Sequence, residues 1–299
     1  MGEERARGGL IYGLGAYLFW GFLPLFFLLL KGVDPVEIVT QRVLWSLALL
    51  LPIVVLIGRR GALRAAIADR RLMLQLTASS ALIAVNWLVY VWAVFNDHVL
   101  AASLGYFLNP LINVALGTIV LKERLTRGQA AAVALAAIGV AVLALRAGDG
   151  LWISLTLAVT FGLYGLLRKM AAVESLEGLT IETAILAPFG LAYLAWQATT
   201  GDVAFGNDLR ISALLMVAGA VTATPLLLFA AAARRMRYST LGLLQYLAPS
   251  IQFILAITIF GEALTTAQLA CFMLIWAACA IYAASSLIEH RRIQAAELC

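Results

Sequence analysis

Long apolar stretches recur from one end of this chain to the other, and they constrain its fold more than any motif does. Each holds about 20 mostly apolar residues, the length of helix that crosses a hydrocarbon core of about 30 Å. Hydrophobic residues make up 63% of the chain and charged residues 12%, whereas soluble domains have roughly 45–50% and 25%. The sequence therefore predicts an all-α membrane protein with many transmembrane helices.

Charged and turn-rich connections divide the chain into ten predicted transmembrane helices, with no connection long enough for a soluble domain. The first stretch follows Arg5 and Arg7 as a signal peptide would, but it continues to Leu30 without a small-residue cleavage site. We therefore expect it to be retained as a helix. The predicted spans are 9–30, 38–57, 72–95, 99–121, 128–145, 151–167, 179–199, 211–232, 238–260 and 267–288.

Basic residues are distributed very unevenly between the two sets of connections. One set holds Arg5, Arg7, Arg59, Arg60, Arg64, Arg70, Arg71, Lys122, Arg124, Arg127, Arg168, Lys169, Arg234, Arg235, Arg237, Arg291 and Arg292. The other set holds only Lys31, Arg146 and Arg210. Because cytoplasmic loops retain Lys and Arg, we expect both termini in the cytoplasm. The net charge of +5 is explained by orientation in the bilayer, so we predict no nucleic-acid partner.

The segment from Arg59 to Arg71 is the most basic of these connections. We expect it to lie along the membrane surface as a short helix.

One apolar segment occurs twice. The stretch from Ser103 to Arg127 returns as Thr240 to Glu262, with Pro110 and Pro249 aligned 139 residues apart. We predict one integral transmembrane unit made of two five-helix repeats, residues 1–147 and 148–299. Because five is odd, the second repeat enters the membrane from the opposite side. Inverted repeats are typical of secondary transporters that bind their substrate near the midplane. The alternative is a duplicated bundle that only senses or scaffolds.

Each copy has a proline in the middle of its span, and Pro110 and Pro249 are the predicted helix-break positions. Proline leaves a carbonyl one turn earlier without its helical donor, which is costly in lipid unless another group satisfies it. Polar side chains share the proline faces at helical spacing. They are Tyr106, Asn109 and Asn113 in the first copy, and Gln245, Tyr246 and Gln252 in the second. We predict that they line a substrate cavity; a kink held by interhelical hydrogen bonds is the alternative.

Four further residues are candidates for the cavity wall. Asn86 and Tyr90 share a face of the third span, and Trp20 precedes Pro24 in the first. Tyr164 stands in the sixth span where Trp20 stands in the first. Aromatic residues near span ends usually form interfacial belts, but these lie deeper.

Two charged residues lie about one turn inside their spans, Arg42 in the second and Glu182 in the seventh, 140 residues apart. Intramembrane charges normally face the protein interior or a water-filled path. Arg42 is suited to attract an anionic substrate, and Glu182 is the candidate for coupling transport to a cation or proton. They lie toward opposite membrane faces, so we expect no direct ion pair. Snorkelling to the nearby interface is the alternative for each.

Motifs of enzymes and ATP-driven pumps are missing. No HExxH, GxSxG, P-loop or GxGxxG motif occurs, so we predict no catalytic residue, no cofactor and no metal site. Cys271, Cys279 and Cys299 match neither a disulfide framework nor a metal pattern. Small residues crowd the fifth and tenth spans and favour close helix packing, within one protomer or in a homodimer.

Four segments carry a family resemblance: 40–46, 92–125, 181–188 and 239–250, which read TQRVLWS, WAVFNDHVLAASLGYFLNPLINVALGTIVLKERL, IETAILAP and STLGLLQYLAPS. Together they resemble the RarD-type permeases of the EamA-like drug/metabolite transporter superfamily. The resemblance implies a bacterial inner-membrane protein with ten helices in two inverted repeats, in a family known from chloramphenicol-sensitivity phenotypes.

These observations lead to one functional prediction. We expect a secondary, ATP-independent transporter of a small organic solute or drug-like metabolite, working by alternating access within the lipid bilayer. Aromatic and amide side chains suit an amphipathic organic molecule better than an inorganic ion.

Overall fold

A computed structural model describes the chain except for residues 1, 97, 146–149, 202, 260–265 and 298–299. Every regular element in this described part is a helix. The helices are α1 (Gly2–Leu28), α2 (Pro35–Leu56), α3 (Arg60–Ala68), α4 (Arg70–Phe95), α5 (Val99–Ile119), α6 (Arg127–Ala144), α7 (Leu151–Met170), α8 (Ser175–Thr200), α9 (Leu209–Ala233), α10 (Tyr238–Leu244), α11 (Leu247–Thr258) and α12 (Thr266–Glu297). The all-helical prediction is confirmed.

Each predicted span coincides with one helix, except that the ninth is divided into α10 and α11. Seven of the described helices, α1, α2, α4, α7, α8, α9 and α12, are long and apolar enough to cross a membrane. Helices α5 and α6 contain shorter apolar stretches, Leu104–Ile119 and Arg127–Val142. A multi-pass membrane protein follows from these lengths, and the count of ten crossings stays a prediction.

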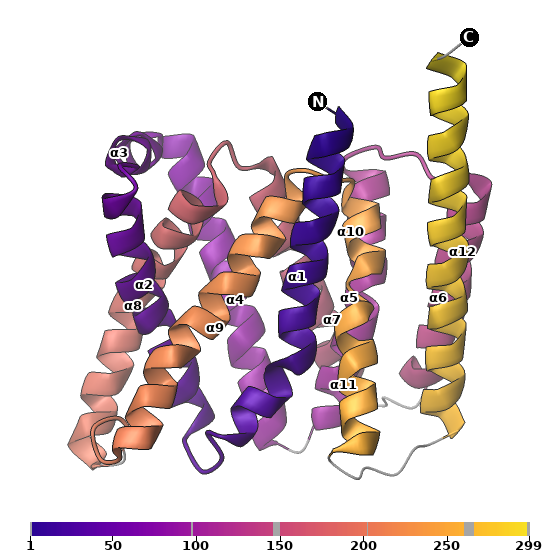
Figure 1. Cartoon of the computed structure of the whole chain (residues 1–299). Coiled ribbons are helices and arrows are strands. Elements are labelled where there is room, and N and C mark those ends of the chain that lie inside the picture. The colour runs from indigo at the N-terminus through magenta and orange to yellow at the C-terminus, as the bar shows by residue number, and fades with distance from the viewer. Residues whose placement is uncertain (1, 97, 146–149, 202, 260–265, 298–299) are drawn as a thin grey trace.

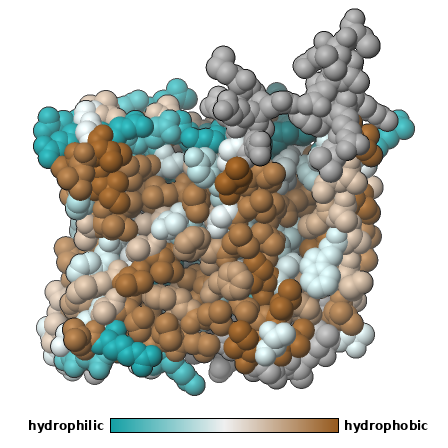
Figure 2. Space-filling model, viewed as in Figure 1, coloured by the Kyte–Doolittle hydropathy of each residue, from teal (hydrophilic) through white to brown (hydrophobic). Residues whose placement is uncertain are grey.

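The helices stand side by side in a bundle, with both ends of the chain at the same end of it (Figure 1). We call this the termini end. The short helix α3 lies there too, across the direction of its neighbours (Figure 1), so the basic segment 59–71 is helical as predicted. A broad apolar band covers the middle of the bundle, and hydrophilic residues gather toward its ends (Figure 2).

Local sequence explains where several helices begin and end. Asp34 accepts the backbone N–H of Glu37 before Pro35 opens α2, and Asp208 caps α9 through the N–H of Ile211. Such side chains satisfy N–H groups that the first helical turn leaves without partners. At the other end of α8, Gly201 adopts φ 82°, a left-handed conformation that favours glycine.

Helix packing follows a regular pattern. Helix α2 packs against α8 and α9, α4 against α7 and α8, α5 against α7 and α10, and α1 against α9 and α11. Helices α6 and α12 form a separate pair at one side of the bundle (Figure 1). A Cβ at Gly139 of α6 would lie 3.1 Å from Leu274 Cβ, so small residues do permit close packing within the protomer. A homodimer contact stays a prediction.

Candidate functional site

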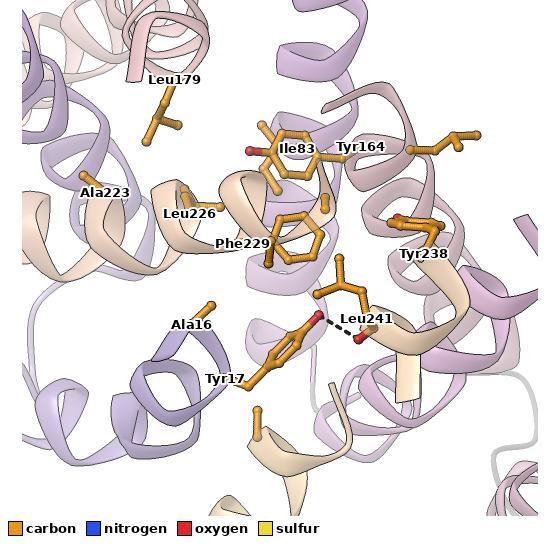
Figure 3. Packing of buried hydrophobic residues seen from close by; sticks show 14 of the residues in the cluster. Ala16, Tyr17, Ile83, Tyr164, Leu179, Ala223, Leu226, Phe229, Tyr238 and Leu241 are labelled. Carbon is orange, nitrogen blue, oxygen red and sulfur yellow. Dashed lines mark hydrogen bonds between the residues drawn. The ribbon is translucent and has the colours of Figure 1, made fainter. Parts of the chain in front are cut away.

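The half of the bundle toward the termini end is packed around an aromatic core. Tyr17, Tyr164, Phe229, Tyr238 and Leu241 are all at most 1% exposed, and they converge from α1, α7, α9 and α10 (Figure 3). The rings of Tyr164 and Phe229 stack at 6.3 Å, and the Tyr17 hydroxyl donates to the Leu241 carbonyl at 3.2 Å. We call these five residues the aromatic plug, because they leave no passage between these helices.

A buried ion pair lies beside the aromatic plug. Glu182 of α8 is 2% exposed and Arg168 of α7 is 1% exposed, with Arg168 Nε 3.8 Å from Glu182 Oε1. That separation exceeds hydrogen-bond distance. The Ser79 hydroxyl of α4 donates to the same Glu182 oxygen. Arg168 Nη2 donates to the Ser175 carbonyl at 3.1 Å. Glu182 is therefore enclosed between three helices and does not snorkel to the surface.

The burial of Arg168 was missed at the level of sequence, where this residue counts only as one of the basic loop charges. Its neighbour Gly178 offered a weak signal, because a Cβ at that position would collide with the Arg168 guanidinium. A glycine inside an apolar helix often marks such a close approach. A positively charged side chain reaches the interior here only because α8 yields space for it.

The two copies of the proline segment meet in the structure. Asn113 of α5 donates its amide to Gln245 Oε1 at 2.8 Å, and both side chains are buried. Pro110 lies inside α5, which stays one helix, so no break occurs there. Helix α10 ends at Leu244 and α11 begins at Leu247. The interruption therefore falls one turn before Pro249, where the proline cannot donate back to the Gln245 carbonyl.

Asn109 differs from its neighbours on this face. It is 2% exposed, yet its Oδ1 accepts no hydrogen bond from the described residues. An unpaired buried acceptor of this kind costs stability, and such groups commonly mark a position that a ligand or water occupies. Asn113 Oδ1 is in the same condition.

Four other predicted site residues make interhelical contacts. Asn86 donates to the Leu157 carbonyl at 2.8 Å and to Thr160 Oγ1 at 2.9 Å. Gln252 donates to the Trp20 carbonyl at 2.9 Å, and the Tyr246 hydroxyl donates to the Phe107 carbonyl at 3.2 Å. The Trp20 ring itself packs against those of Phe161 and Phe229. In this conformation these groups hold helices together instead of facing an open cavity.

The opposite half of the bundle is more open. Tyr106 shares a face of α5 with the buried Asn109 and Asn113, but it is itself 39% exposed. Tyr90 follows the buried Asn86 on the same face of α4 and is 36% exposed. Their rings meet edge-to-face at 6.0 Å. Because both side chains lie on faces that turn toward the protein, their exposed surface borders an opening inside the bundle, which we call the aromatic vestibule.

Arg42 of α2 lies at the depth of this vestibule. Its Nε donates to Thr222 Oγ1 of α9 at 2.6 Å, and its guanidinium carbon lies 5.5 Å from the ring centroids of both Phe27 and Trp87. It forms no ion pair with Glu182 among the described residues, as expected.

A small cavity separates the two charged centres. It measures about 10 Å³, about the space for one water molecule. Thr222 and Trp87, which contact Arg42, line it together with Glu182 and Tyr164. The vestibule and the ion pair are thus divided by a thin layer of side chains at mid-depth.

Comparisons with known proteins decide the family. The description "EamA-like transporter family" matches residues 7–145. An uncharacterized transporter of Pseudomonas aeruginosa is 45% identical over 98% of this chain and 99% of its own length. The protein RarD of Escherichia coli is 41% identical over 98% of this chain and 99% of its own. The chain is a RarD-type member of the EamA-like transporter family. It is therefore a membrane protein of the transporter type, as the sequence resemblance predicted.

A crystal structure shares the fold of this RarD-type chain. It superposes with a TM-score of 0.72 over 92% of this chain and 96% of the other, at 19% sequence identity. At that identity the likeness concerns the fold alone. The named relatives are transporters, and their names supply no enzymatic activity.

Proposed function

We propose that this protein is a secondary transporter that moves a small organic solute through the membrane by alternating access, without ATP. One observation carries the proposal: the two halves of the bundle differ in packing along its axis. The aromatic plug closes the half toward the termini end, whereas Tyr90 and Tyr106 border an opening in the other half. A chain closed on one side of a central site and open on the other corresponds to one state of an alternating-access cycle.

The contacts between helices support an inverted repeat of residues 1–147 and 148–299. Let α1, α2, α4, α5 and α6 correspond to α7, α8, α9, α10–α11 and α12. The α1–α9 contact then corresponds to α7–α4, α2–α9 to α8–α4, and α1–α11 to α7–α5. The contacts α2–α8, α5–α10 and α6–α12 each join corresponding helices, as expected around a pseudo-two-fold axis. Rocking of one repeat against the other would exchange the open and closed ends.

Side-chain packing at the proline segments repeats in the same manner. Ile251 lies where a Cβ on Gly21 of α1 would stand, and Ile112, 139 residues earlier, lies where a Cβ on Gly162 of α7 would stand. Both glycines allow a proline helix to approach the first helix of the other repeat. These close approaches are the surfaces along which the repeats would slide.

The proposed orientation places the termini end in the cytoplasm of a bacterial inner membrane. Most of the basic residues lie in connections at that end, in accord with the positive-inside rule. The conformation described here then opens its vestibule to the outside. Glu182, held beside Arg168 on the cytoplasmic side of the dividing layer, is the proposed coupling residue, and it would exchange a proton or bind a cation once the plug opens.

Solute flux in proteoliposomes tests the function. Purified protein should accelerate the uptake of a ligand that stabilises it in a thermal-shift screen of amino acids, metabolites and chloramphenicol, since a ligand of the native state raises its apparent stability. Protein-free liposomes are the control. Repeated failure to move any ligand that demonstrably binds would favour a sensor or scaffold.

A further inference from the structure

Arg42 carries a positive charge that the described protein does not neutralise. No carboxylate among the described residues lies within ion-pair distance of it, since the four ion pairs found involve Arg59, Arg168, Arg234 and Arg237. A cation within a membrane-spanning helix is costly unless an anion or polar groups compensate it. Its hydrogen bond to Thr222 engages Nε alone, so both Nη groups keep their donors.

The nearest acidic residue on the same helix is already occupied. Glu37 accepts the backbone N–H groups of Ala204 and Phe205 at 2.9–3.1 Å and is 0% exposed. Its carboxylate is directed into the α8–α9 connection and binds there. Glu182 lies beside Arg168 instead. The two acidic groups closest to the path through the bundle therefore leave Arg42 without a counter-charge.

The surroundings of Arg42 are aromatic and accessible. Phe27 and Trp87 flank the guanidinium, and the hydroxyls of Tyr90 and Tyr106 lie close enough to interact with its charge. Guanidinium groups hold carboxylates with two parallel hydrogen bonds, a geometry that favours planar oxyanions. Aromatic side chains around that position would stack with an aromatic or apolar body.

We propose that Arg42 is the receptor for a carboxylate on the transported solute, so that the substrate class is an organic anion with an aromatic or apolar body. Thr222 holds Nε, which aims the two Nη groups at the vestibule. Trp87 and Tyr106 receive the body of the solute. This inference rests on the proposed transport function and specifies the charge that the site selects.

Three probes that share one body and differ in charge test the inference. They are 3-phenylpropionate, 3-phenylpropionamide and 3-phenylpropylamine, added to the purified full-length protein in neutral detergent while its melting temperature is followed. Wild type should be stabilised by the carboxylate and not by the amide or amine. In Arg42→Gln the dissociation constant for 3-phenylpropionate should rise roughly 10- to 100-fold, with Arg42→Lys in between.

Arg210→Gln, which removes an exposed charge outside the vestibule, is the matched control and should bind as wild type does. If Arg42→Gln does not fold, Thr222→Val keeps the charge, removes its hydrogen bond and should still weaken binding of the carboxylate. Equal stabilisation by the amide or amine, unchanged carboxylate binding in the Arg42 and Thr222 variants, or no stabilisation by any probe would each overturn the inference.

Flux measurements separate this inference from the proposed function. If 3-phenylpropionate binds through Arg42 but never crosses a proteoliposome membrane, transport fails and the recognition of carboxylates stands. If the neutral amide crosses as fast as the carboxylate, transport stands and the inference fails.

Discussion

Helices α2 and α8 begin with the same pattern and end up in different chemical states. Each opens with Glu-x-x-Thr, at Glu37 in α2 and at Glu177 in α8, 140 residues apart. Both glutamates are at most 1% exposed. Glu37 accepts three backbone hydrogen bonds from the α8–α9 connection, whereas Glu177 accepts none from the described residues and has Arg59 Nη1 at 3.4 Å.

The same two helices differ again one turn and a half further on. Arg42 borders an open vestibule without a carboxylate partner, and Glu182, its equivalent, is enclosed beside Arg168. The difference teaches that the repeat supplies a common frame, while individual substitutions make one end a receptor and the other a sealed ion pair. The predictions that follow act on one helix or the other, in order of decreasing effect.

Removing the positive partner on the α8 side should have the largest effect. Arg168→Gln leaves Glu182 enclosed without a counter-charge, which costs about 3–5 kcal/mol for a buried pair. Denaturant unfolding in detergent measures the loss. The double variant Arg168→Gln with Glu182→Gln removes both charges and should recover much of the stability; a double variant as unstable as the single one would show that the pair is not the cause.

Neutralising Glu182 alone should alter coupling. If this carboxylate carries the coupling proton, Glu182→Gln should still bind solute but lose the stimulation of its uptake by an imposed pH gradient, because no proton can leave the amide. Uptake into proteoliposomes with and without the gradient measures this. Glu174→Gln, a partly exposed carboxylate at the same end, is the control. Unchanged stimulation in Glu182→Gln removes the coupling role.

The amide pair between the proline segments should contribute less. Gln245→Leu leaves the Asn113 amide donor buried without its acceptor, at a cost of about 1–3 kcal/mol. Because Gln245 occupies the interruption between α10 and α11, we also expect flux to be abolished while expression is retained. Asn109→Leu should impair flux without loss of stability, since its Oδ1 has no partner to lose. Wild-type transport kinetics in both variants would remove these residues from the site.

The two glutamates that start α2 and α8 give the smallest expected difference. Glu37→Gln replaces a carboxylate that binds backbone N–H groups and should destabilise the protein by about 1–2 kcal/mol, since charged hydrogen bonds exceed neutral ones. Glu177→Gln should be close to neutral or stabilising, because its carboxylate accepts no hydrogen bond. Thermal melts of both variants check this, and equal losses would erase the contrast between the two helix starts.

The sequence predicted the helices well because membrane spans are long and their apolar composition is unmistakable. The positions of Pro110 and Pro249 also led to the contact between α5 and α10, since a repeated proline segment in an inverted pair faces its own counterpart. The state of each polar residue was beyond reach. Asn86 and Gln252 satisfy interhelical acceptors, whereas Tyr106 borders an opening, and helical spacing alone does not distinguish these roles.

Arg168 shows the reason most clearly. Seen in the sequence, it adjoins Lys169 at the end of a span and resembles any cytoplasmic charge. Its burial depends on Gly178 of another helix, which leaves room for the guanidinium, and on Glu182, which stabilises it. A long-range arrangement of this kind depends on tertiary packing, so it became visible only in the structure.

The contrast between an open and a sealed half is tested most directly by cysteine accessibility. In a background without native cysteines, Tyr106→Cys and Phe229→Cys are labelled in intact cells with a membrane-impermeant maleimide added from outside. The account predicts rapid labelling at position 106 and none at position 229. Rapid labelling of both positions, or protection of position 106 while position 229 reacts, would contradict it.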